Sequence, residues 1–135
     1  MINNKLKGIW SVDCMYGPGA QSDELLIFLD NGFGWIEMIN WGSMSIETFE
    51  WTVDQKSELT IKGLKIFSNY ERTRKSKINL IDVELKISNE ITSTKEMMEV
   101  MTLSQPIILN IQKFGLETRD VDERYFERRM EVLKS

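Results

Sequence analysis

Apolar and polar side chains alternate with a period of two residues along most of this 135-residue chain. The pattern is clearest over residues 78–87, where four aliphatic side chains would share one face of an extended segment: Ile81, Val83, Leu85 and Ile87. Successive side chains of a β-strand point to opposite faces, so such alternation predicts strands that bury one face. No long segment has a convincing helical period, and the chain is therefore predicted to be all-β.

Short turn sequences divide the chain into about eight to ten predicted strands. The clearest turn signal is Asp30-Asn31-Gly32, which lacks the further ligands of a calcium loop and is better explained as a hairpin turn. Gly63 interrupts the alternation and predicts a bulge or a sharp bend. The predicted strands before Pro106 cover residues 6–14, 22–29, 33–40, 44–53, 59–68, 78–87 and 97–103.

Two later segments complete the predicted strands. Residues 107–111 alternate once more, and residues 124–132 fit a strand or a helix, of which we favour the strand. Neighbouring strands joined by tight turns pair antiparallel, and closing such a meander into a barrel removes its two free edges. We therefore expect one domain over residues 1–135, an antiparallel up-and-down β-barrel, with an open sandwich as the alternative.

The first predicted strand carries Gly8 and Trp10, one residue apart. A Gly-x-Trp motif on a first strand, followed by a meander and an arginine on a late strand, resembles the calycin superfamily, which includes lipocalins and fatty-acid-binding proteins. The resemblance implies that Gly8 and Trp10 lie at the closed end of a lipocalin-like barrel and that Arg128 packs across the indole, with Arg124 and Arg129 as the competing arginines. It also implies a trimmed member, because no long helix is predicted after the barrel.

The Gly8-x-Trp10 pair has a physical explanation in such a barrel. Glycine lets the first strand bend sharply where the barrel closes, and tryptophan fills the bottom of the interior. A guanidinium group over the indole would add about 0.5–2 kcal/mol, depending on how far it is desolvated.

The residues that most catalytic sites need are missing or unfavourably placed. The chain contains no histidine, which removes the commonest general base, the serine–histidine triads and most zinc sites. Cys14 shares a face with Trp10 and is expected to be a buried structural thiol rather than a nucleophile. The paired carboxylates Asp82 and Glu84 face away from the apolar side of their strand and are expected to be solvated. We expect no enzyme activity, no metal and no cofactor.

Four aromatic side chains are the candidate ligand site. Consecutive predicted strands would bring Phe33, Trp35, Phe49 and Trp51 together inside a closed barrel. Small-molecule pockets are mostly apolar with a few fixed polar groups, so this cluster predicts a non-catalytic protein that holds a small apolar or amphipathic ligand. A completely filled barrel interior is the alternative explanation of the same residues.

The uneven charge supports a second hypothesis. Between Gly8 and Ile61 there are nine acidic residues and one basic residue, whereas Lys62 to Lys77 contains six basic residues and one acidic residue. An acidic face attracts basic partners, so the chain is alternatively an inhibitory or immunity-type protein that binds a basic protein. A solvated surface explains the same charges. Nucleic acid is not an expected partner of this net-acidic chain.

The chain has no sequence signal for a membrane or for secretion. Its longest apolar runs, such as residues 25–29, are far too short to cross a bilayer, and the first residues do not resemble a signal peptide. The only cysteine, Cys14, has no partner for an intrachain disulfide. We expect a cytoplasmic protein without a membrane span.

Overall fold

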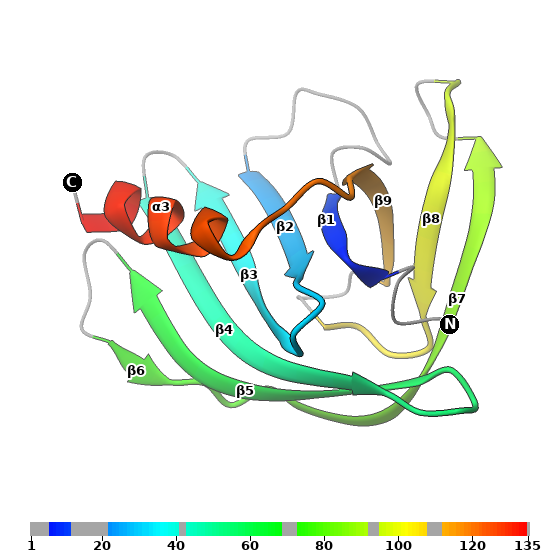
Figure 1. Ribbon diagram of the computed structural model, residues 1–135, viewed down its shortest axis with the longest axis horizontal. Helices are drawn as coiled ribbons and strands as arrows, with labels where there is room; N and C mark the ends of the chain where they lie inside the picture. The colour runs from blue at the N-terminus through cyan, green and yellow to red at the C-terminus, as the bar shows by residue number, and fades with distance from the viewer. Residues whose placement is uncertain are drawn as a thin grey trace.

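The structure, a computed structural model, describes residues 6–11, 22–40, 43–68, 73–91, 95–107 and 112–134 (Figure 1). Within these residues the chain forms strands and one long helical segment near its end. The strands are β1 (Gly8–Ser11), β2 (Ser22–Phe28), β3 (Phe33–Asn40), β4 (Ser43–Val53), β5 (Glu58–Ser68), β6 (Arg74–Lys75), β7 (Asn79–Ile91), β8 (Met97–Leu103) and β9 (Lys113–Thr118). Helix α3 spans Glu123–Lys134.

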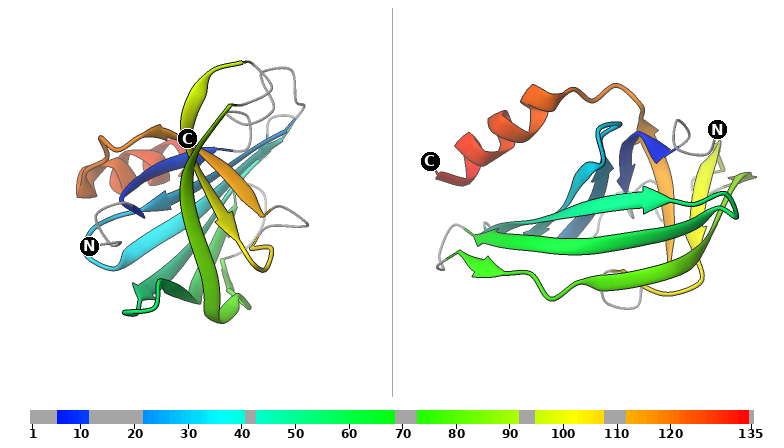
Figure 2. Two further views of the ribbon diagram at one scale, coloured as in Figure 1. Left: turned by 90° about the vertical axis from the view of Figure 1, so that its right-hand side faces the viewer. Right: turned by 60° about the horizontal axis from the view of Figure 1, so that its bottom comes forward.

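Eight of the strands close into an antiparallel barrel in the order β1-β2-β3-β4-β5-β7-β8-β9. The barrel closes because β1 pairs with β2 on one side and with β9 on the other. The short strand β6 lies beside the end of β5 and is additional to the barrel (Figure 2). The predicted up-and-down barrel is confirmed, because the first strand pairs with a strand from the C-terminal part of the chain.

The predicted hairpin turn between β2 and β3 is confirmed. The Asn31 side chain accepts a hydrogen bond from the Phe33 backbone N–H at 3.0 Å, and the Leu29 N–H donates to the Phe33 carbonyl at 2.9 Å. Gly32 adopts a positive φ of 87°, which explains why glycine occupies this turn. Local turn chemistry therefore sets the register of the β2–β3 hairpin.

The alternation predicted for Ile81, Val83, Leu85 and Ile87 is wrong at Ile81, which lies in β7. Val83 and Leu85 are buried, but Ile81 is 62% exposed. Asp82 has a positive φ of 54°, and the pairing of β5 with β7 shifts register between Leu59 and Ile61. This irregularity changes the side to which the preceding residues point, so Ile81 faces solvent.

The strand predicted over residues 124–132 is also wrong, because the segment lies in helix α3. The Asp122 carboxylate accepts a hydrogen bond from the Tyr125 N–H at 2.9 Å, which caps the start of the helix. Tyr125, Phe126 and Met130 have helical spacing and pack against an apolar patch on the outside of the barrel. The expectation that no helix follows the barrel is therefore wrong as well. Among the described residues, no helix is long and apolar enough to cross a membrane.

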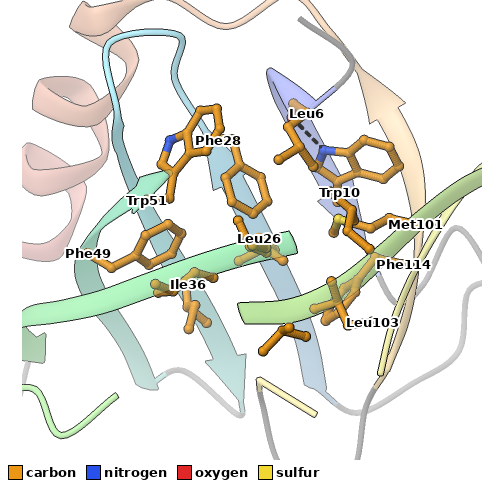
Figure 3. Packing of buried hydrophobic residues seen from close by; sticks show 14 residues of the cluster. Leu6, Trp10, Leu26, Phe28, Ile36, Phe49, Trp51, Met101, Leu103 and Phe114 are labelled. Carbon is orange, nitrogen blue, oxygen red and sulfur yellow. Dashed lines mark hydrogen bonds between the residues drawn. The ribbon is translucent and has the colours of Figure 1, made fainter. Parts of the chain in front are cut away.

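Buried side chains form two clusters on opposite sides of the barrel wall. The inner cluster fills the barrel near β1 (Figure 3) and consists of Leu6, Trp10, Leu26, Phe28, Ile36, Phe49, Trp51, Leu59, Ile61, Val83, Leu85, Met101, Leu103 and Phe114. The outer cluster lies between the outer wall and α3 and consists of Ile9, Leu25, Ile27, Leu29, Trp35, Met44, Ile46 and Val121, with five partly buried residues that include Phe33 and Phe126. Of the strand predicted over residues 107–111, residues 108–111 lie outside the described part of the chain.

Candidate functional site

Gly8 occupies the position where the barrel closes. Its φ of 144° lies in a region that other residues rarely adopt, and a Cβ atom added there would lie 2.6 Å from the Thr118 carbonyl oxygen of β9. The β1–β9 register also shifts between Ile9 and Trp10. Glycine therefore gives β1 both the unusual conformation and the close approach to β9 that closure needs.

Trp10 lies in the inner cluster with none of its surface exposed (Figure 3). Its indole N–H donates a hydrogen bond to the Leu6 carbonyl at 2.8 Å, so the one polar atom of the ring is satisfied inside the core. Gly8 and Trp10 thus lie on the strand whose pairing with β9 closes the barrel, with Trp10 in the inner cluster.

The basic residue at Trp10 is Arg119 and not Arg128, so the predicted role of Arg128 is wrong. The guanidinium carbon of Arg119 lies 6.0 Å from the indole centroid. Arg119 also donates to the Lys7 carbonyl at 3.2 Å and to the Glu99 carboxylate at 2.8 Å. It therefore links the end of β9 to the residue before β1 and to β8. The error follows from the misassigned last strand: β9 ends at Thr118, so the next residue, Arg119, reaches the indole.

Arg128 instead lies on the exposed side of α3. Its guanidinium carbon is 5.9 Å from the Tyr125 ring centroid, and it forms an ion pair with Asp122 at 3.4 Å. Both interactions are local to the helix and its first turn, so Arg128 has no part in barrel closure.

The four aromatic residues predicted to line one ligand site are divided between the two sides of the wall. In the β3–β4 register Trp35 lies opposite Thr48, and Gly34 lies opposite Phe49. Directly opposed residues of paired strands share a face, so Trp35 and Phe49 must point to opposite faces. Phe49 and Trp51 belong to the inner cluster, whereas Phe33 and Trp35 belong to the outer one.

The inner aromatic pair is part of a packed core. Phe28 makes edge-to-face contacts with Phe49 and Trp51, with ring centroids 5.6 and 5.2 Å apart. The Trp51 indole N–H donates to the Leu29 carbonyl at 3.1 Å. Phe49 and Trp51 are therefore packed among the other buried side chains of the inner cluster (Figure 3).

The outer aromatic pair holds helix α3 against the barrel. Trp35 stacks on Tyr125 with ring centroids 5.8 Å apart and meets Phe126 edge-on at 5.1 Å. Phe33 meets Phe126 edge-on at the same separation of 5.1 Å. Phe33 and Trp35 are therefore covered by the chain's own helix.

A buried ion pair lies beside this aromatic contact. Glu37 on β3 has no exposed surface, and its carboxylate accepts two hydrogen bonds of 3.0 Å from Arg129 on α3 and one of 3.0 Å from the Trp35 indole N–H. Burial alone would lower the pKa of Arg129, but the hydrogen bonds and charge of Glu37 outweigh it, so the pKa of Arg129 is raised. Burial raises the pKa of Tyr125, and the charge of Glu37 raises it further. The sequence interpretation missed this pair, which alternation alone does not reveal.

An open pocket of about 650 Å³ lies between β4, β5 and the segment that joins β6 to β7. It is lined by Glu47, Ile66, Arg74, Lys75, Lys77 and Ile78. Glu47 pairs with Ile66 and Ile36 across neighbouring strands, so its side chain points to the inner side of the barrel wall. The pocket therefore combines an inward carboxylate with aliphatic walls and basic side chains.

Ser76 holds the pocket's wall in place. Its hydroxyl donates to the Glu47 carboxylate at 2.6 Å and accepts from the Ile78 N–H at 3.2 Å. Backbone hydrogen bonds from Gly63 to the Ile78 carbonyl, 2.8 Å, and from Ser76 to the Leu64 carbonyl, 3.1 Å, bring this segment against β5. A Cβ atom on Gly63 would overlap the Ser76 hydroxyl, which explains the glycine. The predicted bulge is confirmed, because the β4–β5 register shifts beside Gly63.

The acidic residues of the first half do not all reach the outer surface. Glu24 and Glu37 are buried, and Glu47 is partly buried and hydrogen bonded to Ser76. Asp30, Glu50 and Asp54 are exposed, and Asp13 lies outside the described residues. The acidic face expected from the count of charges is thus smaller than the sequence suggests.

The other predicted positions have separate outcomes. Asp82 and Glu84 are exposed, as predicted. Cys14 lies outside the described residues, so its buried state stays a prediction.

The chain was compared with known proteins at three levels. Searches against protein-family models, curated proteins and solved structures found no significant match. The confirmed barrel therefore describes the fold of this chain, and its likeness to calycins stays a resemblance of pattern.

Proposed function

We propose that this protein binds, without catalysis, a small amphipathic molecule that carries an acidic group. The observation that supports the proposal is the 650 Å³ pocket, whose lining combines Ile66 and Ile78 with the basic side chains Arg74, Lys75 and Lys77. Ligand pockets in proteins are commonly about 300–1,000 Å³, with apolar walls and a few placed polar groups. The pocket has the size and the mixed lining that such a ligand needs.

Each part of the ligand has a matching part of the pocket. An aliphatic or aromatic tail would lie against Ile66 and Ile78, and a carboxylate, sulfate or phosphate would pair with the basic side chains. Glu47 is occupied by its hydrogen bond with Ser76, which fixes one polar edge of the site. This arrangement replaces the four-aromatic site expected from the sequence, whose members pack in the core or under α3.

The experiment uses the anionic amphipathic dye 1-anilinonaphthalene-8-sulfonate, followed by fluorescence at low salt. Lys77→Glu removes a positive charge from the pocket and should weaken dye binding by about tenfold, the effect of 1.4 kcal/mol. Ile78→Asn should also weaken dye binding, because it removes an apolar contact with the aromatic part of the dye. Lys62→Glu is the matched control, because Lys62 is an exposed lysine of β5 that does not line the pocket.

Equal losses for Lys77→Glu and Lys62→Glu would show a diffuse attraction between the dye and a basic surface, and would contradict the proposal. Absence of dye binding to the wild-type protein, together with no binding of a fatty acid, would contradict it as well.

A further inference from the structure

The second half of β7 leaves the barrel as one strand of a projecting ribbon (Figure 1). Residues 79–84 of β7 pair with β5, whereas residues 85–91 pair with β8. No other described strand pairs with residues 85–91, so one edge of this half is free within the described part of the chain. Free strand edges are templates for pairing with another strand.

The alternation of backbone groups identifies which residues face that free edge. The Glu84 carbonyl accepts a hydrogen bond from the Ser104 N–H at 3.0 Å, so Glu84 directs its backbone toward β8. The β7–β8 register continues from there to Ile91 without a shift. In an antiparallel ladder alternate residues point their N–H and C=O groups to opposite sides. Leu85, Ile87, Asn89 and Ile91 therefore present their backbone groups to the free edge.

The tip of the ribbon is also unusually apolar for an exposed position. Ile91 is 68% exposed, and its direct partner on β8, Met97, is 64% exposed. Paired residues share a face, so the two side chains form one apolar tip.

We propose that a second copy of this chain pairs its β7 with this edge, antiparallel, about a two-fold axis at Ser88. In this register Leu85 faces the partner's Ile91 and Ile87 faces the partner's Asn89, so all four edge residues find a partner. Lys86 then lies opposite the partner's Glu90, a carboxylate that is also ion-paired at 3.1 Å with Lys113 of its own chain, and the symmetric contact repeats this arrangement. Opposite charges at directly opposed positions stabilise strand pairing. The edge is thus complementary to itself in both hydrogen bonds and charge.

The neighbouring registers are less favourable. A two-residue shift in one direction places Glu90 opposite the partner's Glu84, and like charges at opposed positions destabilise a sheet. A shift in the other direction leaves Leu85 beyond the partner's Ile91 and takes Lys86 away from Glu90. Of these three registers, the one centred on Ser88 pairs every residue of the free edge that the structure describes.

The molecule also has a place for the apolar tip of the partner. An open pocket of about 550 Å³ lies where β7 leaves β5, lined by Lys56, Ser57, Glu58, Glu84, Leu85, Lys86, Thr102, Leu103 and Ser104. Because Leu85 pairs with the partner's Ile91 in the proposed register, the partner's tip would reach this pocket and contact Leu85 and Leu103. The dimer would cover apolar surface at the tip and in the pocket together.

Sedimentation velocity over micromolar to millimolar protein concentrations tests the proposal. Wild type should form a dimer, and Lys86→Glu or Glu90→Lys should each weaken it by about tenfold or more, because each substitution places like charges at both symmetric contacts. Lys65→Glu is the matched control, since Lys65 is an exposed lysine paired with β6 rather than with the edge. It should leave the dimer unchanged.

Mixing the two single variants is the decisive experiment. In the mixed dimer every opposed pair is again of opposite charge, so an equimolar mixture should dimerise where neither variant does so alone. A wild-type protein that stays monomeric overturns the proposal, and so does a mixture that stays monomeric. None of these edge residues lines the proposed ligand pocket, so the outcome of the dye experiment does not depend on the outcome of the dimerisation experiment.

Discussion

The guanidinium of Arg119 lies 6.0 Å from the indole centroid of Trp10, at the point where the first and last barrel strands meet. The same guanidinium is tied to Glu99 on β8 and to the Lys7 carbonyl. Arg119 therefore connects the two closing strands, β1 and β9, with the buried Trp10 and with β8.

We expect this contact to appear as coupling between the two residues. Trp10→Ala should lower the free energy of unfolding by about 3–5 kcal/mol as a large-to-small core substitution. Arg119→Ala should cost less, and in the double variant the two losses should fall short of their sum by about 0.5–1.5 kcal/mol. Urea unfolding of the four proteins measures the cycle. Arg128→Ala, the exposed control on α3, should change stability by less than about 0.5 kcal/mol, and strict additivity at Trp10 and Arg119 would contradict the contact.

The Glu37–Arg129 ion pair should be essential for docking α3. Arg129→Ala leaves the Glu37 carboxylate buried without its charged partner, which costs about 3–5 kcal/mol when one member of a buried pair is removed. Thermal unfolding and the fluorescence of Trp35 measure the change. Glu127→Ala, which removes an exposed carboxylate from the same helix, is the control, and an equal loss from both variants would exclude a special role for the buried pair.

Stability should fall at alkaline pH through Tyr125. Its pKa in the folded protein is raised above the ordinary value of 10.0, first by burial and then by Glu37. Above the unfolded-state pKa the unfolded chain loses the phenolic proton while the folded chain retains it. The stability that depends on the protonated phenol is therefore complete below the unfolded-state pKa and is lost as the pH rises through the folded-state pKa. Urea unfolding of wild type and Tyr125→Phe between pH 8 and 11 isolates this contribution. A parallel decline of the two proteins would contradict it.

Gly63 should be intolerant of a side chain. Gly63→Ala places a Cβ atom against Ser76 and should cost about 1–3 kcal/mol, because the close approach of the two segments is packed without spare room. The substitution should also weaken dye binding, since Ser76 positions Glu47 in the pocket wall. A second substitution, Ser76→Gly, should recover part of the stability but not the dye binding. Full recovery of both would show that Ser76 has no role in the pocket.

The aromatic residues of the core should affect stability rather than ligand affinity. Trp51→Phe keeps an aromatic ring against Phe28 but loses the indole hydrogen bonds to the Leu29 and Phe33 carbonyls, and we expect the free energy of unfolding to fall by about 1–3 kcal/mol. Dye titration of the folded variant should give the wild-type affinity. A marked fall in affinity without loss of stability would restore Trp51 as a ligand residue.

Local signals in the sequence predicted much of the fold. Strand β8 has the predicted bounds of residues 97–103, and β3 has the predicted bounds of residues 33–40. The turn between β2 and β3 depends on Asn31 and Gly32, whose effects are confined to a few residues. Such elements could be located because the free energy that defines them comes from neighbours in the sequence.

Contacts between distant residues could not be located in this way. Residues 124–132 fit both a strand and a helix period, of which the strand was favoured, and the helix forms because its apolar face packs on Phe33 and Trp35 of the outer wall. That error moved the expected closing arginine from Arg119 to Arg128. The signal that could have corrected it is Asp122, a helix-capping residue three positions before Tyr125.

By itself, the sequence predicted short antiparallel strands joined by tight turns and favoured their closure into a barrel, while the role of Gly8 and Trp10 in that closure was implied only by the resemblance to calycins. The alternation of apolar and polar residues indicates that each strand has two different faces, and the apolar residues indicate that one of these faces is buried. The tertiary structure alone decided which face that is, through the β3–β4 register that opposes Trp35 to Thr48 and sends Trp35 and Phe49 to opposite sides. A change of one residue in register exchanges the two faces of a strand. The pocket of Glu47 and Ser76, like the contact of Arg119 with Trp10, exists only because packing of the whole chain selects one register among these alternatives.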